Sequence, residues 1–116
     1  MKKLLQIFID ESSSTVTKLN KTIDSLKEIS QRDSDNEIDI ALDEENSKAL
    51  CYKILEFTHL MKGLTGNLSA DCLFQIATQL EVHAKDENLE NIFSSQQFFN
   101  KAYEELMKTL TDYIKE

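Results

Sequence analysis

Residues 58–68 read THLMKGLTGNL and lie at the centre of a long helical pattern. They contain one of the two histidines of the chain, His59, and its only two glycines, Gly63 and Gly66. Apolar residues recur through and around this segment at spacings of three and four, the period of one face of an α-helix. These residues are Leu50, Ile54, Phe57, Met61, Leu64 and Leu68. At about 100° per residue, His59 points away from that apolar face. The pattern therefore predicts a central helix from about Glu44 to Leu68, with the His59 imidazole in water.

The two glycines lie on the same outer side of the predicted helix as His59. A glycine inside a helix costs roughly 0.5–1 kcal/mol relative to alanine. The central helix could simply end near Gly66. Because Leu64 and Leu68 continue the apolar face beyond Gly63, we favour the other interpretation, in which the small residues let a second protein approach the imidazole.

Composition limits the classes of function. With 116 residues, 13 basic and 21 acidic, the chain has a net charge of −8, which argues against nucleic acid or an anionic membrane as the main partner. One domain, residues 1–116, is expected at this length. No segment has the pattern of a signal peptide or the roughly 20 apolar residues of a membrane span, so we expect a cytoplasmic protein. Cys51 and Cys72 lack metal-ligand spacing and are interpreted as reduced packing residues.

The rest of the chain also has helical periodicity, and it contains no proline. A first helix is predicted over residues 2–30, either bent within residues 12–15 or preceded by a short extra N-terminal helix. Residues 31–46 are acidic and are predicted to form a connection, a solvated linker being preferred over a regulatory contact. Ser69 is a candidate N-cap for a third helix, and residues 85–88 form a break before a last helix. These elements predict an all-α, antiparallel four-helix bundle with up-down topology.

The segment His59-Leu60-Met61-Lys62-Gly63 resembles the motif of the histidine-containing phosphotransfer (HPt) domain, a four-helix phosphocarrier module of two-component phosphorelays. The resemblance continues in Gly66 and in Leu80-Glu81, and it is good over residues 43–91. It implies that His59 accepts a phosphoryl group from the aspartate of a receiver domain. The implied partners are response-regulator receiver domains or a hybrid sensor histidine kinase. The chain itself would need no cofactor, because the magnesium ion would belong to the receiver domain.

The residues around His59 agree with this chemistry. A neutral, exposed imidazole is a competent nucleophile near neutral pH. Lys62 lies one helical turn further on, where its ammonium group can neutralise phosphoryl charge, and Gly63 leaves space for the partner. The chain is therefore predicted to be a carrier and not a complete enzyme.

Other residues on the outer face of the central helix are candidates for partner binding. They are Lys48, Tyr52, Leu55 and Gly66. Tyr52 and Leu55 would supply exposed apolar area. Glu56 is one turn before His59 and either orients the imidazole or stays solvated, the latter being slightly preferred.

Three alternatives stay open at this point. His83 is a competing acceptor, but Asp86 and Glu87 would repel a phosphate there. Because His83 lies at the edge of the apolar face of the third helix, a partly buried or interhelical histidine is expected. The chain beginning at Met1 with no catalytic domain favours a free-standing carrier over the excised phosphotransfer domain of a larger chemotaxis-type or hybrid kinase. The last alternative is a helical adaptor that is never phosphorylated.

Overall fold

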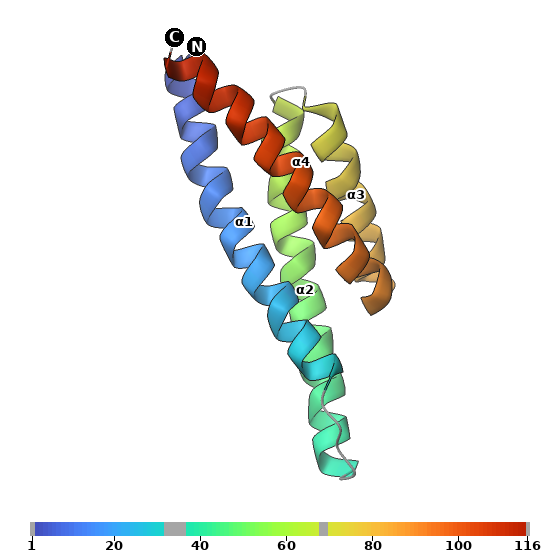
Figure 1. Cartoon of the computed structure of the whole chain (residues 1–116). Coiled ribbons are helices and arrows are strands. Elements are labelled where there is room, and N and C mark those ends of the chain that lie inside the picture. The colour runs from blue at the N-terminus through green and yellow to red at the C-terminus, as the bar shows by residue number, and fades with distance from the viewer. Residues whose placement is uncertain (1, 32–36, 68–69, 116) are drawn as a thin grey trace.

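Four long helices form an antiparallel bundle in the computed structural model, which describes residues 2–31, 37–67 and 70–115. They are α1 (Lys2–Ser30), α2 (Glu37–Asn67), α3 (Asp71–Lys85) and α4 (Leu89–Lys115). Each helix packs on the two beside it, α4 closing the ring against α1, and both ends of the chain lie at the same end of the bundle (Figure 1). The predicted all-α four-helix bundle is confirmed. No helix within the described ranges has an apolar segment long enough to cross a bilayer.

The predicted apolar faces turn inward. Helix α2 buries Ile54 and Met61, and α3 buries Leu73, Ala77, Leu80 and Ala84. Helices α1 and α4 complete the core with Val16, Leu19, Ile23, Leu26, Ile92 and Phe99. Because burial fixes the rotation of α2 about its own axis, the opposite face of that helix must lie in solvent.

Helix α1 is continuous from Lys2 to Ser30, so the alternative of a separate N-terminal helix is wrong. Ser12 is fully buried. Its hydroxyl group donates to the Ile9 carbonyl at 3.3 Å and forms a hydrogen bond of 2.9 Å with the Tyr103 hydroxyl. The serine therefore bonds across to α4 while the helix runs on past residues 12–15. Two further hydrogen bonds, Gln96 to Asn20 and Asn20 to Asn100, continue this polar seam between α1 and α4.

The acidic segment 31–46 is not simply a connection. Helix α2 begins at Glu37, about two turns earlier than predicted, so residues 37–46 belong to the helix. The start was misplaced because the acidic composition of this segment was interpreted as a solvated linker, whereas the backbone is helical from Glu37 onward. As Figure 1 shows, the hairpin of α1 and α2 extends beyond the turn between α3 and α4.

Helices α2 and α3 both bury small side chains. Thr58 and Thr65 are fully buried and seven residues apart, as are Ala77 and Ala84 on α3. Both threonine hydroxyls donate to carbonyls of their own helix, Thr58 to Ile54 at 2.9 Å and Thr65 to Met61 at 2.7 Å. Helix separation depends on the side chains at the contact, and small buried side chains of this kind allow packed helices to approach closely.

The turn from α3 to α4 is short because two capping arrangements share it. The Asn88 amide donates to the His83 carbonyl at 2.9 Å and the Glu87 amide to the Ala84 carbonyl at 3.1 Å, which is a Schellman motif. The Asn88 side chain then caps α4 by accepting from the Asn91 amide at 3.2 Å. At the other end of α3, Ala70 is the N-cap residue and makes no side-chain cap bond. Ser69, the predicted N-cap, lies outside the described residues.

Glu87 is the position in this turn at which a substitution should stabilise the fold. It has φ of 54°, the left-handed conformation in which a side chain is disfavoured relative to glycine. Glu87→Gly should raise the free energy of unfolding by about 0.5–1 kcal/mol, as measured by urea denaturation. Glu87→Ala, which removes the same charge but keeps the Cβ atom, is the control and should give no comparable gain. Equal stabilisation by both variants would attribute the effect to charge and contradict the backbone argument.

Candidate functional site

His59 stands on the outer face of α2, as the sequence predicted. Its side chain is 83% exposed. Gly63, one turn further along, is also exposed, and a Cβ atom placed there would meet nothing within 4 Å. The imidazole therefore stands one turn from a position with open space around it.

A carboxylate from α3 joins His59 and Lys62 into one cluster. The two Glu81 oxygens face different partners: Oε1 lies 3.5 Å from Lys62 Nζ, and Oε2 lies 4.0 Å from His59 Nδ1. Glu81 and Lys62 are only 15% and 26% exposed, in contrast to His59. The Lys62 ammonium is therefore held at the α2–α3 contact, next to His59.

This arrangement gives the two imidazole nitrogens different surroundings. At 4.0 Å the contact between Nδ1 and Glu81 is electrostatic and too long for a hydrogen bond. A carboxylate on that side favours a proton on Nδ1, which leaves the lone pair on Nε2. The nitrogen available for attack is then the one that faces away from Glu81.

Sequence reasoning did not assign Glu81 to the site. The residue was part of the HPt resemblance, and it lies 22 positions after His59 in the next helix. Only the packing of α3 on α2 brings them together. Glu56, which was weighed as a partner of His59, is exposed, in agreement with the preferred solvated state.

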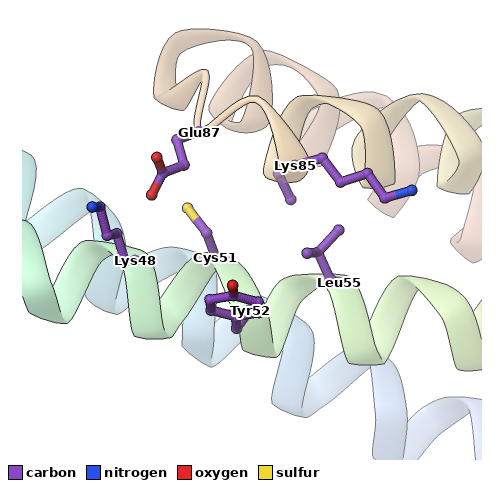
Figure 2. Close-up of a pocket in the computed structure, with 7 residues that line it drawn as sticks. Lys48, Cys51, Tyr52, Leu55, Lys85 and Glu87 are labelled. Atoms are coloured by element: carbon purple, nitrogen blue, oxygen red, sulfur yellow. The ribbon is translucent and has the colours of Figure 1, made fainter.

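Three of the four predicted partner-binding residues border one pocket. It has a volume of about 370 Å³, and its lining consists of Lys48, Cys51, Tyr52, Leu55, Ala84, Lys85 and Glu87. Figure 2 shows Lys48 and Cys51 projecting from α2 toward the turn that carries Glu87, while the Lys85 ammonium group points away from both. Tyr52 is 70% exposed, as predicted, but Leu55 is half-buried against the core, so its apolar contribution to this surface is smaller than expected.

The fourth residue, Gly66, lies elsewhere. A Cβ atom at Gly66 would stand 3.7 Å from the ring of Phe74. This glycine therefore borders an aromatic side chain of α3, whereas Gly63 borders open space.

A second hollow flanks His59 on the α1 side. It has a volume of about 570 Å³ and is lined by Glu11, Ser14, Thr15, His59, Leu60, Gly63 and Leu64. Leu60 is largely exposed there. The imidazole thus stands between a groove formed with α1 and the Lys62–Glu81 pair formed with α3.

The two cysteines differ, although both are free. Cys51 is buried, and this burial, followed by the nearby Glu87 carboxylate, raises the pKa of its thiol. A thiol with a raised pKa stays protonated and is a poor nucleophile, which fits the predicted packing role. Cys72 is exposed on α3, so the prediction of a packing residue was wrong for that position.

The remaining candidates add little to the site. His83 is partly buried, as predicted. Within residues 2–31, 37–67 and 70–115, no group of three histidine, cysteine or acidic side chains is arranged to hold a metal ion.

Comparisons with models of protein families, with curated proteins and with solved structures gave no match to this chain. The functional argument therefore depends on the site itself.

Proposed function

We propose that the chain is a phosphohistidine carrier of a phosphorelay, in which His59 takes a phosphoryl group from the aspartate of one receiver domain and passes it to another. The observation that carries the proposal is the cluster of an exposed imidazole with a half-buried lysine and a carboxylate that contacts both, His59 Nδ1 at 4.0 Å and Lys62 Nζ at 3.5 Å. Resemblance of residues 59–63 to the HPt motif supports the same function.

The chemistry can be assigned to these three side chains. The lone pair of His59 Nε2 attacks phosphorus, the bond from phosphorus to the receiver's carboxylate oxygen breaks, and the carboxylate leaves with the electron pair. The imidazole, which keeps its Nδ1 proton, becomes positively charged as the N–P bond forms. Glu81 faces Nδ1 and stabilises that charge, while Lys62 attracts the phosphoryl oxygens. Transfer to the next receiver reverses these steps.

Glu81 also holds the Lys62 ammonium group in position before a phosphoryl group arrives. When no phosphoryl group is present, the carboxylate neutralises the ammonium group and keeps it at the α2–α3 contact. When a dianionic phosphoryl group arrives, it competes with Glu81 for the same cation. Because Lys62 is held in advance, little side-chain entropy is lost when it meets the phosphoryl group.

The decisive experiment is incubation of the chain with a ³²P-phosphorylated receiver domain. We expect label on the chain that is lost in acid and kept in base, as for phosphohistidine, and that is lost when a second, unlabelled receiver is added. If a panel of receivers and a phosphoramidate control leave the chain unlabelled, the phosphocarrier function is wrong, and a bundle that serves only as an adaptor is the remaining candidate.

Lys62→Ala should slow phosphoryl transfer while the fold is kept. A partly exposed charge contact contributes up to about 1 kcal/mol, so we expect a rate about fivefold lower, measured by rapid quench with one receiver. The control is Lys53→Ala, which removes an exposed lysine of the same helix. Equal rates for both variants across a range of salt concentrations would show that Lys62 is only a surface residue.

A further inference from the structure

Phe74 lies beside the Lys62–Glu81 pair and has no role in the chemistry described so far. It belongs to the first turns of α3, seven residues before Glu81. Residues seven apart on a helix lie on nearly the same face, so Phe74 and Glu81 both face the Lys62 side chain. The ammonium group is 5.8 Å from the centroid of the Phe74 ring and 3.5 Å from Glu81 Oε1.

The ring position is consistent with a cation–π interaction. An ammonium group within about 6 Å of an aromatic centroid is attracted by the negative face of the ring. Phe74 is 36% exposed, so solvent screens this attraction only in part. Lys62 is thus held by two groups of α3, an aromatic ring and a carboxylate, two helical turns apart.

The Phe74 ring lies next to Gly66 of α2. An ideal Cβ atom on Gly66 would be 3.7 Å from Phe74 Cε2 and 3.8 Å from Cδ2, which is ordinary van der Waals contact. The ring therefore lies beside Gly66, one turn after Lys62, with room for a Cβ atom between the ring and the α2 backbone. Alanine would be accepted at Gly66, whereas a longer side chain would have to occupy the space of the ring.

We propose that Phe74 is a positioning residue for Lys62: its ring keeps the ammonium group beside Glu81 and His59 and prevents it from turning outward along α3. Phe74 contacts no reacting atom and acts only through Lys62. The consequence for phosphoryl transfer rests on the proposed function, but the placement of Lys62 does not.

The placement can be measured without any phosphoryl chemistry. In ¹³C–¹H spectra of lysine-labelled protein, the ε-methylene protons of Lys62 should be shifted upfield by the ring current of Phe74. Phe74→Leu should move them to the positions of exposed lysines, while Phe98→Leu, which removes an exposed phenylalanine of α4, should leave them in place. An unshifted Lys62 signal in the parent protein would overturn the proposal.

The effect on chemistry is tested with phosphoramidate, a small donor that needs no partner protein. His59 forms a bond to phosphorus while the bond from phosphorus to nitrogen breaks and ammonia leaves. We expect Phe74→Leu to lower the initial rate of His59 labelling about two- to fivefold, the range for a partly exposed cation–π contact. In the Lys62→Ala background the same substitution should have no further effect, because the residue that Phe74 positions is gone.

The outcomes separate the two proposals. Phe74→Leu could lower the labelling rate equally in the parent protein and in the Lys62→Ala variant, or in neither of them. Either result would mean that Phe74 does not act through Lys62. Replacing Phe74 by 3,4,5-trifluorophenylalanine, which nearly keeps the shape but weakens the negative face of the ring, should slow labelling as Phe74→Leu does; a normal rate would overturn the cation–π argument. Absence of labelling in the parent protein would refute the phosphocarrier function, and the lysine spectra would still decide whether Phe74 positions Lys62.

Discussion

His59→Gln should abolish phosphoryl acceptance and leave the bundle intact. The side chain is 83% exposed, and within the described part of the chain its one charged contact is the 4.0 Å approach of Glu81, so its loss removes the nucleophile but almost no packing. We expect acid-labile label to fall to background, with a change in the free energy of unfolding of less than about 0.5 kcal/mol, as for most surface substitutions. Labelling from a ³²P-labelled receiver and urea denaturation monitored by circular dichroism measure the two quantities.

His83→Gln is the matched control for this prediction. It makes the same chemical change in the only other histidine, which is partly buried on α3. Its label should stay at the level of the parent protein. Full labelling of the His59 variant, or loss of label from a folded His83 variant, would transfer the acceptor role to His83.

Gly63→Gln should separate transfer between proteins from the chemistry of the imidazole. A Cβ atom at Gly63 meets nothing within 4 Å, and the position lies inside α2. Glutamine has a better helix propensity than glycine, so the fold should be stabilised by about 0.5 kcal/mol. Yet the new side chain would project beside His59, into the space that a receiver needs to bring its phosphoryl group in line with the imidazole.

Misplacement of reacting groups by about 1 Å can cost roughly 100-fold in rate, so we expect transfer from a receiver to Gly63→Gln to be at least tenfold slower. Labelling by phosphoramidate, which is small enough to avoid the new side chain, should be nearly unchanged. Gly63→Ala should be at least as stable as the parent and retain most of the transfer rate. An unaltered receiver rate in Gly63→Gln would refute the close-approach argument, and unfolding of that variant would contradict the open space around Gly63.

The sequence by itself determined the helices and their inward faces. Apolar residues at three- and four-residue spacing predict which side of each helix is buried, because an amphipathic helix must cover that side. This rule was sufficient to place His59 and Gly63 in solvent, and both lie there. It was also sufficient to predict a partly buried His83.

The rule was not sufficient where a side chain bonds outside its own helix. Ser12 was expected to interrupt α1, but its hydroxyl group pairs with Tyr103, 91 residues later. Cap preference alone likewise favoured Ser69 as the N-cap of α3, where Ala70 takes the cap position. The local preference of a residue for a cap or turn does not show which side chain of another helix will form its hydrogen bond.

Only the tertiary structure decided how the site is assembled. Glu81 lies 19 residues after Lys62 and 22 after His59, and Phe74 lies eight after Gly66. Helical periodicity gives the side of each helix on which these residues lie, but not the relative height of two packed helices or their separation. The packing of α3 on α2 sets that height and separation, and it brings the carboxylate and the ring to Lys62.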